Sequence, residues 1–184
     1  AWPPDLPQRN QHRLLLPPLF DYVFVAHRDA APTFSAQRDG LPVHWLPMAC
    51  DPEVHGEIPS ERIYDVGFVG AYDTRYPERV QMLDALAARY RMNDFKQRYY
   101  LQEMARIYSQ SKIAINITHT DRILNMRLFE VPAAGALLLT DRSENNGQSA
   151  ILRDGTHMVT FKGREELLAK VDYYLTHEAE RSQI

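Results

Sequence analysis

The chain has 184 residues, of which 45% are hydrophobic and 24% are charged, as is typical of a folded globular protein. Its formal net charge of -3 argues against a nucleic-acid-binding protein, because such proteins usually carry a basic excess. A single cysteine, Cys50, excludes an internal disulfide and favours a reducing compartment. The histidines show no zinc-binding spacing, and no apolar run or leader suggests a membrane span or signal peptide. We therefore expect a cytoplasmic protein without a bound metal.

Proline content divides the chain into two parts. Ten of the twelve prolines lie within the first 59 residues, and each proline fixes φ and removes a backbone donor. The front part is therefore expected to hold only short elements: strands at 21–26 and 43–46, a short helix at 31–38 and a linker at 51–62. This pattern predicts a small, partial N-terminal lobe with a linker over residues 1–60 and a larger lobe over residues 61–184.

The back part alternates strand and helix patterns. Apolar runs typical of buried strands occupy 65–69, 113–118, 136–140 and 157–161. Helices are predicted from a cap at Asp73 or Thr74, around 101–108, over 125–134 with Gly135 as a left-handed stop, around 149–153 and from about 165 onward. The alternation predicts an α/β fold, a Rossmann-like parallel sheet with helices on both faces.

Ligands of such sheets bind beyond the carboxyl ends of the strands, where helix N-termini gather. The first loop at this edge has Gly70, where backbone could approach a phosphate, and Arg75 and Arg79 at the start of the next helix, where guanidinium groups could bind it. One glycine in place of three disfavours a dinucleotide cofactor. An ordinary turn with exposed arginines is the alternative that the pattern alone favours.

The second loop leads into the helix predicted over 125–134. Asn125 is expected to be its N-cap, and Arg127 and Glu130 share a face because they are three residues apart. Such a pair could bind a ligand with both phosphate and hydroxyl groups, although an exposed ion pair explains the spacing equally well. Pro132 is expected to remove one hydrogen bond in the middle of this helix and to kink it.

Two further positions are candidates. Backbone amides around Asn146 and Gly147, in a long polar loop, could wrap a phosphate, with an ordinary surface loop as the alternative. His119 lies at the predicted end of a strand and is a weak candidate for a catalytic residue. A lone histidine there is more often a polar loop residue.

The order of these pieces resembles group 1 glycosyltransferases. The resemblance is carried by Tyr-Asp-Val-Gly-Phe-Val-Gly at 64–70, Asn-Met-Arg-Leu-Phe-Glu at 125–130 and Gly-Ala-Leu-Leu-Leu-Thr-Asp at 135–141. It is closest to the branch that includes spore-maturation-type glycosyltransferases, which Leu-Pro-Met-Ala-Cys-Asp at 46–51 also resembles. The resemblance implies a two-lobed GT-B fold whose C-terminal lobe binds a nucleoside diphosphate sugar and whose N-terminal lobe binds the acceptor.

The same resemblance assigns roles to individual residues. Glu130 matches the acid that holds the donor ribose, and Arg127 and the Gly147 loop match groups near the diphosphate. The family needs no metal, because basic side chains and helix N-termini stabilise the departing diphosphate. No cofactor is expected beyond a UDP- or GDP-linked sugar as substrate.

The predicted function is therefore a metal-independent glycosyltransferase that transfers sugar to an unknown acceptor, with this chain mainly binding the donor. Two alternatives stay open: a non-catalytic, degenerate module for protein interaction, and a nucleotide-sugar epimerase, which shares the two-lobed architecture. The short front part also suggests a homodimer or a partner that supplies the missing acceptor lobe.

Overall fold

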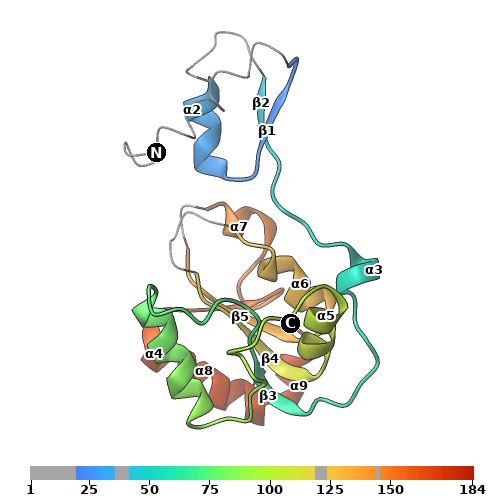
Figure 1. The fold of residues 1–184 in the computed structure, drawn as a ribbon, viewed down its shortest axis with the longest axis vertical. Coiled ribbons are helices and arrows are strands. Elements are labelled where there is room, and N and C mark those ends of the chain that lie inside the picture. The colour runs from blue at the N-terminus through green and yellow to red at the C-terminus, as the bar shows by residue number, and fades with distance from the viewer. Residues whose placement is uncertain (1–19, 36–41, 119–123, 144–145) are drawn as a thin grey trace. The chain divides into compact units, whose positions relative to one another are not determined.

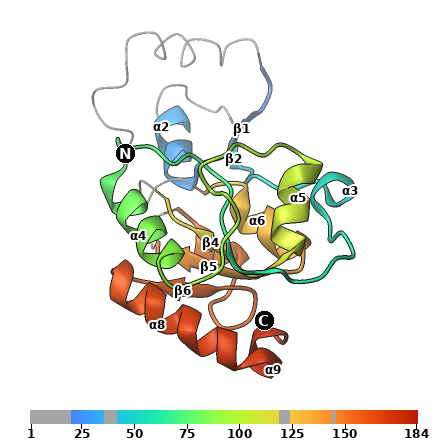
Figure 2. The same ribbon diagram turned by 60° about the horizontal axis from the view of Figure 1, so that its bottom comes forward.

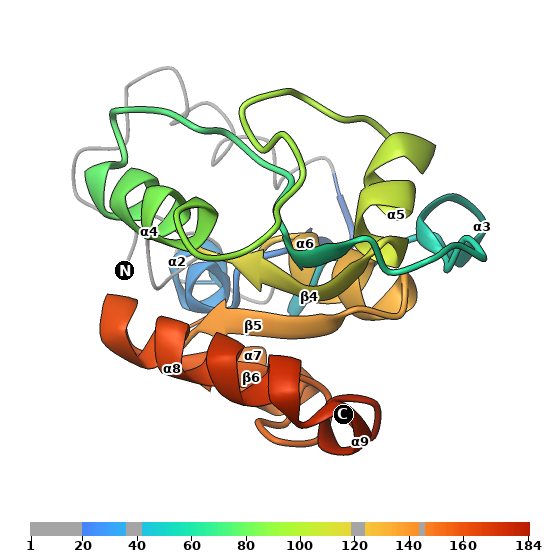
Figure 3. The same cartoon turned by 90° about the horizontal axis from the view of Figure 1, so that it is seen from below.

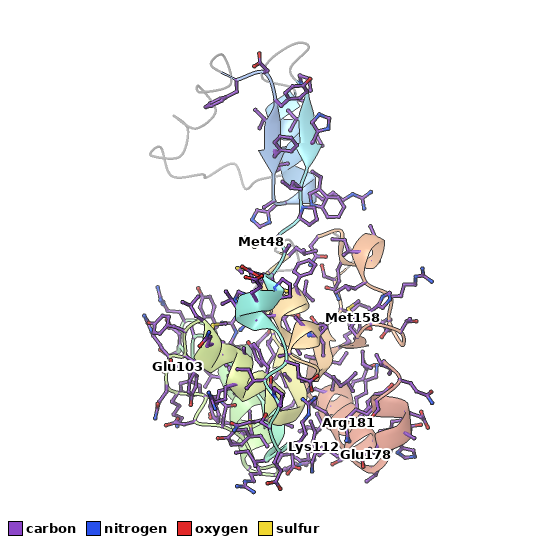
Figure 4. All side chains as sticks on the ribbon, turned by 90° about the vertical axis from the view of Figure 1, so that its right-hand side faces the viewer. Met48, Glu103, Lys112, Met158, Glu178 and Arg181 are labelled. Atoms are coloured by element: carbon purple, nitrogen blue, oxygen red, sulfur yellow. The ribbon has the colours of Figure 1, made fainter. Side chains whose placement is uncertain are left out.

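In the computed structural model of the chain, the described residues are 20–35, 42–118, 124–143 and 146–184. They form two compact units (Figure 1). Of the described residues, the first unit contains 20–35, 42–48, 124, 143 and 146–148, and the second contains 49–118, 125–142 and 149–184. Met48, labelled in Figure 4, is the last residue before the second unit begins. The second unit thus starts at Ala49, and the segment predicted as a linker packs as part of it.

The first unit contains a two-stranded parallel sheet. Strand β1 (Val23–Val25) pairs with β2 (Val43–Trp45), so both predicted strands are confirmed. Between them lie a 3-10 turn, η3 (Arg28–Ala30), and the short helix α2 (Ala31–Ser35). The indole of Trp45 donates to the carbonyl of Ala26 at 3.3 Å, which ties the end of one strand to the other.

The second unit is built on a four-stranded sheet in the order β3 (Tyr64–Gly67), β4 (Ser111–Asn116), β5 (Leu137–Asp141) and β6 (Val159–Phe161). Every neighbouring pair is parallel. The parallel sheet predicted from the alternating pattern is confirmed. Because all four strands run in one direction, their carboxyl ends meet at a single edge.

Helices cover both faces of this sheet, as predicted. The helices in this part of the chain are α3 (Pro52–His55), α4 (Pro77–Ala87), α5 (Gln102–Ser109), α6 (Arg127–Ala133), α7 (Gln148–Ile151), α8 (Gly163–Thr176) and α9 (Glu178–Arg181). Neighbouring helices α4 and α8 bury Leu83, Leu86, Leu167 and Val171 in one core with Ile113 and Ile115 of β4 (Figure 3). Side chains alternate along a strand, so Ala114 and Asn116 face the other side, where α5 and α6 lie beside α3 (Figure 2).

Arg181 in α9 helps to link the two C-terminal helices. Arg181 donates to the carbonyl of Tyr174 in α8 at 2.7 Å and forms an ion pair of 3.2 Å with Glu178 (Figure 4). Among the described residues, none of the helices is long and apolar enough to cross a membrane.

The backbone just beyond β3 is fixed by a buried amide side chain. Asn93 accepts from the amide of Phe68 at 2.9 Å and donates to the carbonyl of the same residue at 2.9 Å. Both Asn93 and Phe68 are buried. The side chain therefore replaces a strand partner where β3 has ended, and it holds the chain that leads to Gly70.

We predict that Asn93→Ala destabilises the chain by about 1–3 kcal/mol, because it leaves a buried N–H and a buried C=O of Phe68 without a partner. The measurement is urea unfolding. Gln97→Ala, at an exposed side chain of the same segment, is the control and should change the free energy of unfolding by less than about 0.5 kcal/mol. Equal effects of the two substitutions would contradict this role of Asn93.

Candidate functional site

The carboxyl edge of the sheet is organised by Asn116, the last residue of β4. Its amide nitrogen donates to the hydroxyl of Thr140 at 3.0 Å. Its oxygen accepts from the Asn125 amide at 2.8 Å and from Nε of Arg127 at 2.9 Å. Asn116 and Thr140 are fully buried, so this side chain fixes Asn125 and Arg127, where the loop ends and α6 begins, against two strands.

Arg127 opens helix α6 and reaches across the edge of the sheet. Its Nη1 donates to the carbonyl of Val69 at 3.0 Å, and its guanidinium lies 5.2 Å from the centre of the Phe68 ring. Burial lowers the pKa of Arg127, an effect opposed by the charges or dipoles of Tyr108, Glu130 and Asp141. Arg127 is half-buried, and none of the described carboxylates forms an ion pair with it.

Gly70 is required by the position of that guanidinium. A Cβ atom at Gly70 would lie 2.3 Å from Nη1 of Arg127 and 2.9 Å from Cζ of Phe68. Any side chain would therefore displace Arg127 or the ring beneath it. The structure brings together two of the predicted site residues here, with glycine making room for an arginine.

A second arginine, Arg79 in the first turn of α4, is buried at 5% exposure. Its Nη1 donates weakly to the carbonyl of Ala71 at 3.4 Å, and its guanidinium lies 4.9 Å from the Tyr76 ring centre. Among the described residues, its buried Nε has no hydrogen-bond partner. Burial lowers the pKa of Arg79, and the positive charge of Arg127 lowers it further. Two guanidinium groups thus act on one another electrostatically at this edge.

Arg75 behaves differently from its neighbour. It is exposed, and its guanidinium binds the carboxylate of Asp73 with an Nη2–Oδ2 distance of 2.6 Å. Hydrogen bonds from the side chain and backbone of Arg75 lower the pKa of Asp73 to about 2. The predicted capping of α4 by Asp73 or Thr74 is wrong: Tyr76 precedes the helix and makes no side-chain cap bond, because Asp73 is engaged with Arg75.

The carboxylate of Asp141, at the end of β5, joins two strand ends. Its Oδ2 accepts from the amide of Thr118 at 2.8 Å and also from the Thr118 hydroxyl. This pairing holds the chain that follows β4 in place. Asp141 also acts electrostatically on Arg127 and Arg79, so it limits the positive charge of the edge.

Glu130 lies one turn beyond Arg127 on α6 and is buried at 4% exposure. Its Oε1 is 3.7 Å from Nε2 of His55, which comes from α3. Burial raises the pKa of the Glu130 carboxyl, while the nearby His55 and Arg127 lower it. The alternative of an exposed ion pair between Arg127 and Glu130 is therefore wrong, since each side chain has its own partners.

The start and end of α6 differ in part from the prediction. The N-cap is Met126, with helical φ and ψ and no side-chain cap bond, so Asn125 is not the cap. Its amide points to Asn116 instead. Gly135 has φ 76°, which confirms the left-handed stop, and the helix ends at Ala133. Pro132 thus falls in the last turn and not in the middle of the helix.

Two predicted residues belong to the other unit. Asn146 is buried, and its side chain accepts from the amide of Gln148 at 2.9 Å. Gly147 has φ 86°, and a Cβ there would lie 2.8 Å from the Trp45 ring. The candidate His119 lies outside the described residues. Within the ranges that the structure describes, no cluster of side chains could hold a metal ion.

Four contributors to the site were not predicted from the sequence: Asn116, Thr140, Asp141 and His55. A signal was present for the first three, since each is a polar residue that ends an otherwise apolar strand run. For His55 there was none, because its contact with Glu130 joins segments far apart in the chain.

We predict that Arg127→Met leaves the free energy of unfolding within about 1 kcal/mol, because lost hydrogen bonds are offset by removal of a half-buried charge. Arg62→Met is the matched comparison and should cost about 1–3 kcal/mol. Arg62 donates to the carbonyls of Ser111 at 2.7 Å and Gly135 at 2.8 Å and pairs with Glu57. Urea unfolding measures both, and a larger loss for Arg127→Met would show that Arg127 is a structural tie.

Solved structures share this fold at low sequence identity. HepE of Anabaena, crystallised with UDP and glucose, has a TM-score of 0.73 and 10% identity over 98% of this chain and 61% of its own. Sucrose-phosphate synthase of Thermosynechococcus elongatus has a TM-score of 0.65 and 11% identity over 100% of this chain and 57% of its own. The DNA-modifying β-glucosyltransferase has a TM-score of 0.56 and 17% identity over 92% of this chain and 64% of its own.

This chain therefore spans about three fifths of the length of HepE. Among curated proteins, no sequence matches it. The fold is that of a GT-B glycosyltransferase lobe, as the sequence predicted. Residues 51–184 match the model of the glycosyl transferase-like family, and the chain belongs to that family.

Proposed function

We propose that the second unit binds the nucleoside diphosphate of a sugar donor, and that the protein transfers that sugar to an acceptor without a metal ion. We place it in the spore-maturation-type branch, which the motifs at 46–51 and 125–130 resemble. The observation that carries the proposal is the pair of arginines, Arg79 and Arg127, at the carboxyl edge of the parallel sheet.

The two guanidinium groups suit a diphosphate. Arg127 has no ion-pair partner among the described carboxylates, and Arg79 has a buried Nε without a partner. An anion would supply both charge and acceptors, and guanidinium groups bind phosphate oxygens with strong, directional hydrogen bonds. In sugar transfer, negative charge grows on the departing diphosphate, so preformed cations there would stabilise the transition state in the role that metals play elsewhere.

Glu130 suits the ribose of the same donor. An ionised carboxylate only accepts hydrogen bonds, and the two ribose hydroxyls can both donate. Glu130 lies one helical turn from Arg127 on the same face of α6, so one ligand could meet both. Support for uridine as the base comes from HepE, whose structures are complexes with UDP and with UDP-glucose.

The first test is calorimetry of a panel of nucleoside diphosphates in buffer with EDTA. We expect UDP or GDP to bind despite the chelator, and Arg127→Met to weaken that binding at least tenfold, since a charge-assisted contact contributes about 1.5–3 kcal/mol. Arg75→Ala is the control and should bind normally, because Arg75 is exposed and held by Asp73. No detectable binding of any nucleotide would sink the proposal.

The second test separates ribose from diphosphate. Glu130→Gln should weaken UDP binding about tenfold while leaving the affinity for inorganic pyrophosphate unchanged, because a neutral amide is a poorer acceptor for ribose hydroxyls. Competition titrations of both ligands measure the ratio. Equal losses for UDP and pyrophosphate would mean that Glu130 acts on the diphosphate or on the fold.

A further inference from the structure

The contact between His55 and Glu130 joins two buried titratable side chains from different helices. His55 is 8% exposed and Glu130 is 4% exposed. Helix α3, which carries His55, packs against both α5 and α6. The two side chains approach end to end, with Nε2 of His55 3.7 Å from Oε1 of Glu130.

The hydrogen bonding of His55 decides which atom meets the carboxylate. Its Nδ1 lies 3.1 Å from the backbone carbonyl of Asp51. A carbonyl can only accept, so Nδ1 carries a proton, and in the neutral ring Nε2 is then a bare acceptor. A bare Nε2 and an ionised carboxylate would repel one another. A proton on Nε2 or on Oε1 would replace this repulsion with attraction.

The two placements of that proton differ in what Glu130 can do. With the proton on His55, the carboxylate is ionised and both its oxygens can accept from hydroxyls. With the proton on Glu130, one oxygen becomes a donor and the side chain loses acceptor capacity. A ligand that donates two hydroxyls selects the first arrangement.

We propose that His55 is a positioning residue for Glu130: its Nε2 lies at the Glu130 carboxyl and favours the ionised form, which stays available for the donor's ribose hydroxyls. This rests on the proposed function, in which Glu130 meets the ribose. His55 acts only through Glu130 and does not touch the donor itself.

Three other titratable groups act on Glu130: Arg127, Tyr108 and Cys50. Arg127, on the same helix, favours the ionised carboxylate, as His55 does. The Tyr108 hydroxyl from α5 is buried without a partner among the described residues, and burial raises its pKa. The Cys50 thiol, next to Asp51, also has a raised pKa, mainly through burial. Neither of these two groups is basic, so His55 and Arg127 are the basic side chains that oppose the effect of burial on the pKa of Glu130.

The affinity for UDP should depend on pH, because it depends on the ionisation of Glu130. Burial raises the pKa of Glu130, and His55 lowers it. UDP binding should therefore weaken as pH falls through that pKa, and the loss should level off at about tenfold, the loss expected for Glu130→Gln. Replacing His55 removes the opposing charge, so the midpoint should move to higher pH by about one unit.

The experiment is a titration with UDP from pH 5 to 8 of the full chain and of the His55→Gln and His177→Gln variants. His177→Gln is the control, because His177 is exposed and directly follows α8, far from α3 in the sequence. His55→Gln should raise the midpoint by about one pH unit, while His177→Gln should not. Glu130→Gln serves as the baseline, because any pH dependence that it retains comes from the ligand's phosphates. Pyrophosphate affinity should be the same with and without His55.

The possible results distinguish the proposed function from the positioning role of His55. If UDP fails to bind the unaltered chain, the proposed function falls. If UDP binds but His55→Gln leaves the midpoint unchanged, the positioning role is overturned and the proposed function stands. Should His55→Gln fail to fold, nitrogen NMR of the His55 ring in the unaltered chain decides: UDP should increase the doubly protonated form, and an unchanged ring would refute the role.

Discussion

The charge at the carboxyl edge of the second unit depends on how a half-buried guanidinium is held at the end of a parallel sheet. Arg127 receives its acceptors from two different strands: the Asn116 side chain at the end of β4 and the Val69 carbonyl beyond β3. Thr140, from β5, fixes the Asn116 amide in turn. Gly70 leaves the space that the guanidinium fills. The ends of three strands and the start of α6 are thus linked, directly or through Asn116, to the guanidinium of Arg127.

The burial of the Arg127 charge costs folding free energy, but the same charge is available to an anionic ligand. The acceptors of Arg127 are an amide oxygen and a carbonyl, both neutral, while Asp141 is engaged with Thr118. Neutral acceptors orient a cation without cancelling its charge, so the cost of its partial burial is not fully offset within the chain. A preorganised, uncancelled charge is what an anionic leaving group needs. Arg79, buried nearby on α4, adds to the same potential.

Hydrophobic patterning was sufficient to predict the strands of the parallel sheet. The strands at 65–69, 113–118, 136–140 and 157–161 were confirmed, because apolar runs bounded by turn residues report burial directly. Gly135 was confirmed as a left-handed stop, since that conformation favours glycine. Local rules failed where a side chain had a better partner elsewhere. Asn125 does not cap α6, because its amide binds Asn116, and Asp73 does not cap α4, because it binds Arg75.

The site could be predicted only in part for the same reason. The spacing of Arg127 and Glu130 correctly placed them on one helix, but it could not show that their partners come from other segments. Val69 and His55 are distant in sequence from α6, and nothing local identifies them. Asn93 is a similar case, since its bond to Phe68 joins a loop to the end of a strand. Long-range polar pairing of this kind has no periodic signature.

The most direct measurement is a crystal structure of the chain soaked with UDP. We expect the diphosphate oxygens to lie within hydrogen-bond distance of the guanidinium groups of Arg127 and Arg79, and the ribose hydroxyls to contact Glu130. UDP bound elsewhere, with Arg127 contacting only Val69 and Asn116, would contradict this expectation.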